Sequence, residues 1–348
     1  MPHDNPLGLD GFEFVEFTSP DPEALGDLFR RLGFAHRSDH KVKKVRHYAQ
    51  GDINFLLNME ASGHAEDFRG AHGPSASAMA FRVADAERAL AMTVERGATR
   101  VEGEYGLPAI EGIGGSYLYL VDRYGADTIY DRDFEPTGED VAPSGLHTLD
   151  HLTHNVHRGR MDHWAQFYER IFNFRQIRYF DIEGQQTALL SRAMTAPDDK
   201  IRIPLNESQD EFSQIEEFLR EYKGEGIQHL ALATDDIFAT VDQLRANGIR
   251  FQDSPDTYYD MIDKRVPGHG HSIAEMRKHR ILIDGSPETG EGLLLQIFTE
   301  NMIGPIFFEI IQRKGNEGFG EGNFKALFES IELDQIRRGV IPAASEHA

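Results

Sequence analysis

Hydrophobic positions in this chain switch between a helical period and a strand period in a repeating order. Asp21-Pro22 begins a predicted helix whose apolar residues share one face, and Gly33 ends it. Strands are predicted after this helix, around residues 46–48 and 53–58. The unit is therefore one strand, one helix and then two or three strands.

The same unit recurs along the chain. His147–Leu152 resembles Gly8–Phe12 and leads into a predicted helix at 161–172, followed by strands around 187–191 and 201–206. Each half then contains a second strand that runs into a helix. These pairs are 77–85 with 86–96, and 226–235 with 237–246. The pattern predicts four modules, two in each half.

The modules predict an α+β fold of tandem βαβββ units, arranged as two open-barrel domains with a C-terminal helix. Several strands follow each helix, which argues against a doubly wound parallel sheet. The glycines of 318–322 lack the context of a dinucleotide-binding loop and indicate a flexible segment. A polar stretch at 134–145 separates the halves. We expect an N-terminal domain at residues 1–140 and a C-terminal catalytic domain at residues 141–348.

Composition narrows the choice of partners. The 348 residues include 36 Lys and Arg against 58 Asp and Glu, a net charge of −22, which disfavours nucleic acid and anionic membranes. There is no cysteine, so His, Asp and Glu are the available metal ligands. The N-terminus lacks the pattern of a signal peptide, and no stretch approaches the ~20 apolar residues of a membrane span. We expect a cytoplasmic protein.

His151 is the first candidate metal ligand. A strand at 149–157 would place His151, Thr153, Asn155 and His157 on one polar face. The spacing of His151, His154 and His157 is also compatible with a metal cluster on a helix, although the intervening Thr, Asn and Val disfavour helix.

Two further residues offer ligands on other strands. His229 shares a strand face with Ala231 and Ala233, whose small side chains leave room for a substrate. Glu309 lies within an apolar strand, where a buried carboxylate must be neutralised, paired or metal-bound. An ion pair with Lys or Arg is the alternative for Glu309.

The N-terminal half lacks these ligands. In the repeat, Gly11 takes the place of His151, Met79 that of His229, and Tyr130 or a near neighbour that of Glu309. Two His and one carboxylate on separate strands form a facial triad, which is typical of non-haem Fe(II) and leaves about three positions open. Zn or Mn is the alternative metal.

The chain resembles the 4-hydroxyphenylpyruvate dioxygenases of the bacterial type, in the vicinal-oxygen-chelate superfamily. The resemblance is weaker before residue 140. Six segments carry it: Asp150–Val156, Ile203–Glu207, Gly226–His229, Leu293–Phe298, Phe307–Glu309 and Gly318–Phe324.

The resemblance implies an oxidoreductase with one Fe(II) per chain, bound by His151, His229 and Glu309. The substrate would be a 2-oxo acid that chelates the iron, without external 2-oxoglutarate. The implied reaction consumes O2 and 4-hydroxyphenylpyruvate and releases homogentisate and CO2, in tyrosine and phenylalanine catabolism. A homo-oligomer, a dimer or tetramer, is expected.

The resemblance also implies a substrate pocket. Its polar residues would be Ser191, Asn206, Gln214, Gln228 and Gln296. Its lining and lid would include Phe298, Phe307, Phe319, Gly320 and Phe324, with a lid helix at about 323–338. A solvated or merely structural side chain is the alternative for each Gln, core packing is the alternative for each Phe, and a helix that only packs is the alternative for the lid. His269 and His271 are interpreted as loop residues.

Three other functions share this fold. Hydroxymandelate synthase has the same triad and substrate, and Phe298 favours ring hydroxylation over that reaction. An extradiol dioxygenase would not need the C-terminal helix. A metal-free binding or resistance module would have no reason to keep all three ligands in one half.

Overall fold

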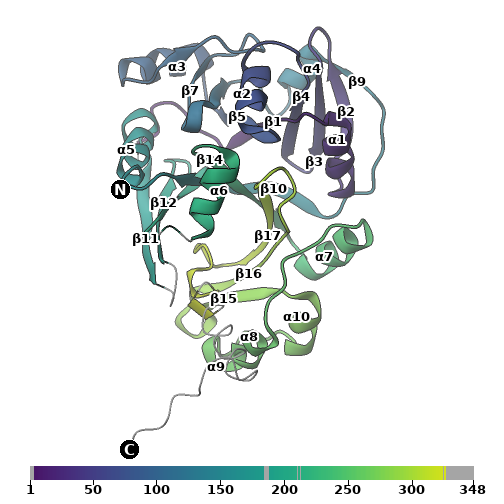
Figure 1. The fold of residues 1–348 in the computed structure, drawn as a ribbon, viewed down its shortest axis with the longest axis vertical. Coiled ribbons are helices and arrows are strands. Elements are labelled where there is room, and N and C mark those ends of the chain that lie inside the picture. Colours follow the sequence, from purple (N-terminus) through teal and green to yellow (C-terminus); the bar gives the residue numbers. More distant parts are fainter. Residues whose placement is uncertain (1–3, 184–187, 210, 212, 324, 327–348) are drawn as a thin grey trace, which may run out of the picture.

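The computed structural model describes residues 4–183, 188–209, 211, 213–323, 325 and 326. These residues form two mixed β-sheets with helices around them (Figure 1). The first sheet has the order β6 (Arg100–Val101), β7 (Ala109–Glu111), β8 (Tyr117–Val121), β5 (Ser75–Arg82), β1 (Phe12–Thr18), β4 (Ile53–Asn58), β3 (Val45–Gln50), β2 (Ala35–His40) and β9 (Phe134–Pro136). The second has the order β11 (Arg175–Glu183), β12 (Ala188–Thr195), β13 (Arg202–Ser208), β10 (Leu146–Val156), β14 (Gly226–Thr234), β17 (Phe307–Lys314), β16 (Gly292–Phe298) and β15 (Leu282–Ser286).

Helices connect the strands within and between modules. The N-terminal half contains α1 (Pro22–Arg31), α2 (His64–His72), α3 (Ala86–Glu95) and α4 (Ile129–Asp133). The C-terminal half contains α5 (Met161–Phe172), α6 (Gln214–Tyr222), α7 (Ile237–Ala246), α8 (Asp256–Asp260), α9 (Ile262–Arg265) and α10 (Ile273–His279). Short 3-10 helices lie at Ile113–Gly115 and Pro287–Thr289.

The four predicted modules are confirmed, and each has the same pairing rule. The first and last strands of a module pair in parallel, as β1 with β4, β5 with β8, β10 with β13 and β14 with β17. The first strands of the two modules in each half pair antiparallel. A parallel pair requires a crossover connection, which the helix of each module supplies. The predicted fold class is therefore confirmed.

Local chemistry explains where the helix α1 begins and ends. The carboxylate of Asp21 accepts a hydrogen bond from the amide of Ala24 at 3.1 Å, and Pro22 occupies the first turn, where no amide donor is needed. Gly33 follows the helix at φ +92°, a conformation that favours glycine. The predicted helix boundaries are confirmed here.

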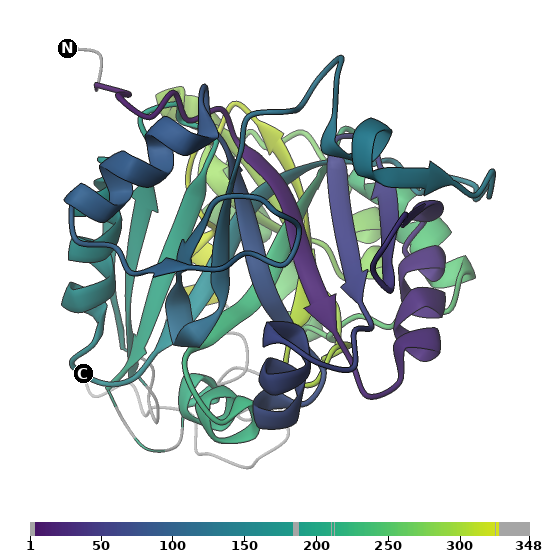
Figure 2. The same ribbon diagram turned by 90° about the horizontal axis from the view of Figure 1, so that it is seen from above.

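The two sheets lie side by side as layers (Figure 2). Their outer faces share one hydrophobic core with α1 and α5. Phe55 of the first sheet lies 6.1 Å from Phe308 of the second, measured between ring centroids. Phe81 similarly contacts Phe172 at 5.2 Å. Because this core belongs to both halves, each half supports the position of the other.

The inner faces of the two sheets differ. Buried aromatic and aliphatic side chains, including Phe14, Leu56 and Tyr119, occupy the inner face of the first sheet. The apolar cluster on the inner face of the second sheet consists of Ala231, Leu294 and Ile311, with Ala233 at its edge. Ala231 and Ala233 leave room on this second face, where the candidate site lies.

The predicted position of Tyr130 in the repeat is wrong. Tyr130 lies on helix α4, so it does not occupy the place of Glu309, and β8 is the strand equivalent to β17. The module ends at β8, and α4 and β9 follow it closely in the chain. The sequence pattern does not show where the last strand of the module ends, so Tyr130 was aligned with Glu309. His269 and His271 lie in the loop between α9 and α10, as predicted. The division at residues 140 and 141 stays a prediction.

Candidate functional site

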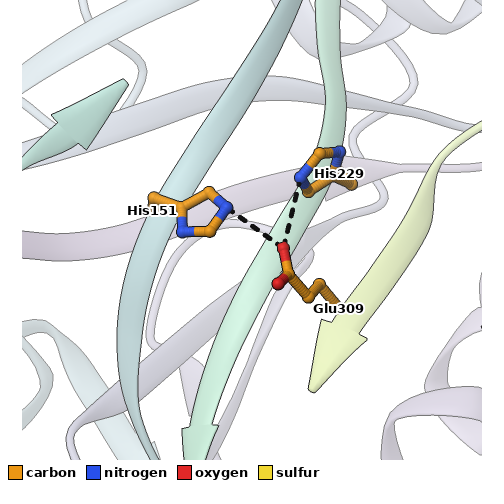
Figure 3. A group of neighbouring side chains, drawn as sticks. All are labelled: His151, His229 and Glu309. Carbon is orange, nitrogen blue, oxygen red and sulfur yellow. Dashed lines mark ion pairs between the residues drawn. The ribbon is translucent and has the colours of Figure 1, made fainter. Parts of the chain in front are cut away.

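Three buried side chains meet on the inner face of the second sheet, on the neighbouring strands β10, β14 and β17. In the ladder, Ala231 of β14 lies between His151 and Glu309, and His229 comes one step further along the same strand face. Nε2 of His151 lies 3.1 Å from Oε2 of Glu309, and Nε2 of His229 lies 3.5 Å from the same oxygen (Figure 3). One ligand atom from each residue lies within 4.8 Å of the others.

These residues fit a divalent metal ion. Among the described residues, Glu309 pairs with the two histidines and with no Lys or Arg. Its second oxygen, Oε1, is buried and has no hydrogen-bond partner. A buried carboxylate oxygen without a partner is costly, and a cation at this point would satisfy it. Two imidazole nitrogens and one carboxylate would occupy one side of such an ion.

The electrostatics of the triad favour the ligating forms of two of its members. Burial acts to raise the pKa of Glu309, but the charge and hydrogen bonds of the histidines outweigh it and lower the pKa. Burial lowers the pKa of His229. At His151 burial acts in the same direction, but Glu309 and Asp150 outweigh it, so its pKa is raised.

Two β-bulges orient the ligating histidines. The ladder pairs Leu149 with Leu232 and His151 with Ala231, which leaves Asp150 as the extra residue on β10. A second bulge on β14 leaves Gln228 as the extra residue before His229. Oδ1 of Asp150 lies 2.8 Å from Nδ1 of His151, and Oε1 of Gln228 lies 3.0 Å from Nδ1 of His229. Each acceptor fixes a tautomer with Nδ1–H, which leaves Nε2 free to bind a metal.

The predicted polar residues Ser191 and Asn206 lie side by side in the β12–β13 ladder. Asn206 is also the parallel partner of Asn155 on β10. Asn155 is fully buried, and neither atom of its amide has a hydrogen-bond partner. Asn155 was not singled out from the sequence, although its alternation with His151 and Thr153 was the available signal.

Gln296 is buried on β16 beside the segment at 315–323. Its Oε1 accepts a hydrogen bond from Nδ2 of Asn323 at 3.3 Å. Gly320 has φ +76°, and a β-carbon there would lie 1.8 Å from Oε1 of Gln296. Glycine is therefore required for this approach.

Three of the predicted aromatic residues contact the histidines. The ring of Phe307 stacks on His229 at a centroid distance of 4.9 Å and an interplanar angle of 21°. Phe298, the ladder partner of Glu309, lies 6.3 Å from His229. The ring of Phe319 meets His151 edge-on at 5.3 Å. These rings limit the access of water to the triad.

Other predicted residues are not brought to the triad. Gln214 is exposed at the start of α6, so its contact with a substrate stays a prediction. Phe324 and residues 327–338 of the predicted lid helix lie outside the described residues. A cavity of about 410 Å³ lies between α1 and residues 301–304, and none of the predicted site residues lines it. No helix in the described part of the chain has the length and apolar character needed to cross a membrane.

Comparisons with known proteins agree with this geometry. Residues 3–135 match the family described as "Hydroxyphenylpyruvate dioxygenase, HPPD, N-terminal", and residues 148–261 match "Glyoxalase/Bleomycin resistance protein/Dioxygenase superfamily". The chain is 61% identical to a 4-hydroxyphenylpyruvate dioxygenase of Pseudomonas aeruginosa, over 97% of each chain. It is 60% identical to the protein named Hemolysin VllY of Vibrio vulnificus, over 97% of this chain and 98% of that one.

A solved structure has the same fold. The chain superposes with a TM-score of 0.80 on a triple variant of 4-hydroxymandelate synthase from Streptomyces coelicolor, which is 26% identical, over 94% of this chain and 99% of that one.

The two sheets and the His-His-Glu site define a dioxygenase of the vicinal-oxygen-chelate fold with a candidate metal centre in its C-terminal half. Several relatives at 51–61% identity over nearly their whole length are named 4-hydroxyphenylpyruvate dioxygenase. The chain belongs to the 4-hydroxyphenylpyruvate dioxygenase family.

Proposed function

We propose that this chain binds one Fe(II) ion through His151, His229 and Glu309 and converts 4-hydroxyphenylpyruvate and O2 to homogentisate and CO2. The buried triad, with the unpartnered oxygen of Glu309, is the observation that carries this proposal. Two imidazoles and one carboxylate that leave coordination positions open are typical of non-haem Fe(II) sites. Zn and Mn accept similar ligands and are the alternative metals. The reaction would belong to tyrosine and phenylalanine catabolism.

The bound metal would supply the redox chemistry and the Lewis acidity for decarboxylation of the 2-oxo acid by O2. The residues of the chain would hold this metal and orient its ligands. Asp150 and Gln228 keep Nε2 of each histidine directed at the metal position. Phe307 packs against His229 and covers one face of its ring.

The substrate has a phenol at one end and a 2-oxo acid at the other. We assign its polar contacts to Ser191, Asn206, Gln228, Gln296 and Gln214. Neutral amides and hydroxyls bind such groups without adding a charge to a buried site. Phe298, Phe307, Phe319, Gly320 and Phe324 would line the pocket, and a lid helix at about 323–338 would close it.

The N-terminal domain, residues 1–140, would serve as a metal-free scaffold. Support for this comes from its inner face, where rings such as Phe14 and Tyr119 take the space that the second sheet leaves open. We further propose a cytoplasmic homo-oligomer, a dimer or tetramer.

The test is oxygen uptake by the Fe(II)-loaded protein with 4-hydroxyphenylpyruvate, with the product identified by mass and chromatography. Homogentisate with one CO2 per O2 consumed is expected. Hydroxymandelate as the product would instead indicate the reaction named for the structural neighbour from Streptomyces coelicolor. Absence of uptake by protein that has bound iron would contradict the proposed substrate.

A further inference from the structure

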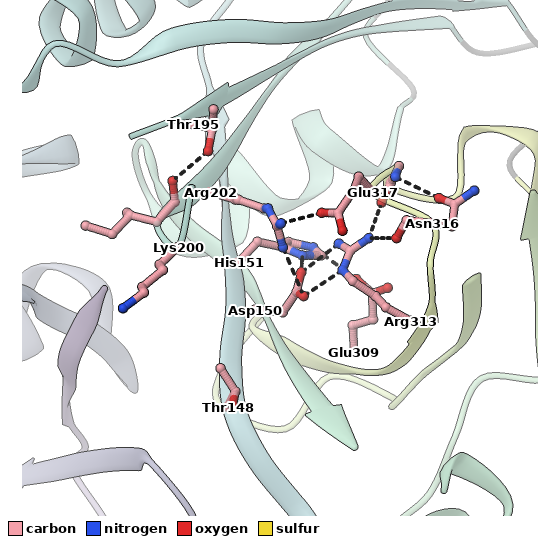
Figure 4. Close-up of polar contacts among 12 residues, drawn as sticks. Thr148, Asp150, His151, Thr195, Lys200, Arg202, Glu309, Arg313, Asn316 and Glu317 are labelled. Atoms are coloured by element: carbon pink, nitrogen blue, oxygen red, sulfur yellow. Dashed lines mark hydrogen bonds and ion pairs between the residues drawn. The ribbon is translucent and has the colours of Figure 1, made fainter. Parts of the chain in front are cut away.

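Asp150 connects the metal ligand His151 to a distant part of the chain. Its Oδ1 accepts from Nδ1 of His151, and both of its oxygens accept from Arg313, at 2.7 Å from Nε and 2.8 Å from Nη2 (Figure 4). This pairing of guanidinium and carboxylate is bidentate, which fixes the orientation of Asp150 as well as its charge. Only 6% of the Asp150 side chain is exposed.

Arg313 also holds the segment that follows β17. Its Nη1 donates to the backbone carbonyls of Asn316 at 3.0 Å and Gly318 at 2.7 Å. The guanidinium lies over the ring of Phe319, 5.7 Å from its centroid. One side chain therefore fixes both the carboxylate behind His151 and the backbone that carries Phe319.

The far end of this segment reaches the predicted pocket. Phe319 places its ring edge-on against His151, and Gly320 packs directly on Gln296. The amide of Asn323 donates to the carbonyl of Gly320 at 2.9 Å, while its side chain donates to Gln296. Movement of residues 315–323 would thus change contacts of both His151 and Gln296.

We propose that Arg313 is a positioning residue that couples metal binding at His151 to the placement of residues 315–323 over the site. The inference rests on the metal role proposed above for His151, His229 and Glu309. Coupling between two sites is reciprocal, so the metal orders the segment, and loosening the segment weakens the metal. A group that accepts a hydrogen bond from the other ring nitrogen of a ligating histidine typically raises the metal affinity 10–100-fold.

The chain offers a matched control. Arg202 also contacts Asp150, with Nη1 at 3.4 Å from Oδ2, and its other partner is the side chain of Glu317. It donates to neither of the two carbonyls that Arg313 holds. Arg202→Gln therefore removes a positive charge beside Asp150 and one ion pair to the exposed side chain of Glu317 in the segment, and it leaves both backbone contacts of Arg313.

The experiment measures Co(II) binding to the metal-free protein by visible absorption, together with amide hydrogen exchange in residues 315–323. Arg313→Lys keeps the charge that Asp150 needs but cannot span the carboxylate and two carbonyls. It should weaken Co(II) about 10-fold and remove the slowing of exchange that Co(II) causes in the wild type. Arg202→Gln should bind Co(II) within about 3-fold of the wild type and keep this protection, since its contact with Asp150 is longer and its ion pair with the segment involves the exposed side chain of Glu317.

A double-variant cycle checks the route of the coupling. Asp150→Asn should weaken Co(II) by a similar factor, and the double variant Asp150→Asn/Arg313→Lys should lose little more, because both changes act on one contact. Additive losses, or equal losses in Arg313→Lys and Arg202→Gln, would overturn the proposal. Wild-type Co(II) affinity and wild-type protection from hydrogen exchange in Arg313→Lys would also overturn the proposal. A wild-type protein that binds no Co(II) would contradict the proposed metal site itself, and this proposal with it.

Discussion

Gly320 and Gln296 touch so closely that a β-carbon on Gly320 would lie 1.8 Å from Oε1 of Gln296. We predict that Gly320→Ala lowers kcat/KM at least about 10-fold, since either the segment or Gln296 must move, and small misplacements of positioning groups are costly. Steady-state kinetics with 4-hydroxyphenylpyruvate measures this effect.

Gly159→Ala is the control for Gly320→Ala. Gly159 has nearly the same backbone angle, φ +77° against +76°, but no atom lies within 4 Å of its added β-carbon. Both variants carry a similar backbone strain of about 1 kcal/mol. An equal loss of activity in the two variants would show that strain, not contact with Gln296, is responsible.

Removal of any member of the triad should abolish stoichiometric metal binding. We predict this for His151→Ala, His229→Ala and Glu309→Ala, with the circular dichroism spectrum retained, because the ligands lie on the inner face beside Ala231 and outside the large shared core. Metal content after dialysis is the measurement.

The control for the triad tests the helical arrangement of histidines that the sequence left open. His157 is exposed, and His154 hydrogen-bonds with Tyr168 at 2.8 Å on the opposite side of the sheet from the triad. His157→Ala should therefore keep the full metal content. A loss there, or retained metal in a triad variant, would contradict the ligand assignment.

Asn155 should lower the stability of the folded protein but raise its kcat/KM. Its buried amide lacks partners, and a buried unsatisfied polar group costs about 1–3 kcal/mol. Asn155→Leu should therefore leave the thermal unfolding temperature unchanged or raise it, while kcat/KM falls about 10-fold, because Asn155 neighbours Asn206, which is proposed to bind substrate. Wild-type kinetics in this variant would exclude Asn155 from the pocket.

Glu16 should make stability depend on pH. Burial raises its pKa from 4.5 to about 7, against hydrogen bonds from Ser77 and Tyr105. The folded protein thus holds this proton more tightly than the unfolded chain. The resulting stabilisation is present below pH 4.5 and is lost as the pH rises through about 7, and amounts to roughly 3 kcal/mol.

Urea unfolding at pH 5 and pH 8 tests this dependence. Glu16→Gln cannot ionise, so its stability relative to the wild type should improve by about 2.5 kcal/mol from pH 5 to pH 8. Glu111→Gln, the same change at an exposed position, is the control. A pH profile of Glu16→Gln that parallels the wild type would contradict the assignment.

The sequence alone determined the modules and the triad. Strand and helix periods are local properties, so helices such as α7 at Ile237–Ala246 and strands such as β4 at Ile53–Asn58 were predicted with their observed bounds. Small neighbours marked the face of His229, and a charge within an apolar strand marked Glu309. The N-terminal half of the repeat lacks these ligands. The two halves of one chain could therefore be compared, and the comparison singled out the three residues.

Only the tertiary structure decided how the triad is supported. A β-bulge adds one residue without changing the hydrophobic pattern, so the turn of Asp150 and Gln228 toward the histidines has no sequence signal. Asp150 and Arg313 are 163 residues apart, and their contact exists because β10, β14 and β17 are neighbours in the sheet. The periodicity of a strand shows which side chains share a face, whereas the packing of strands decides which of them meet.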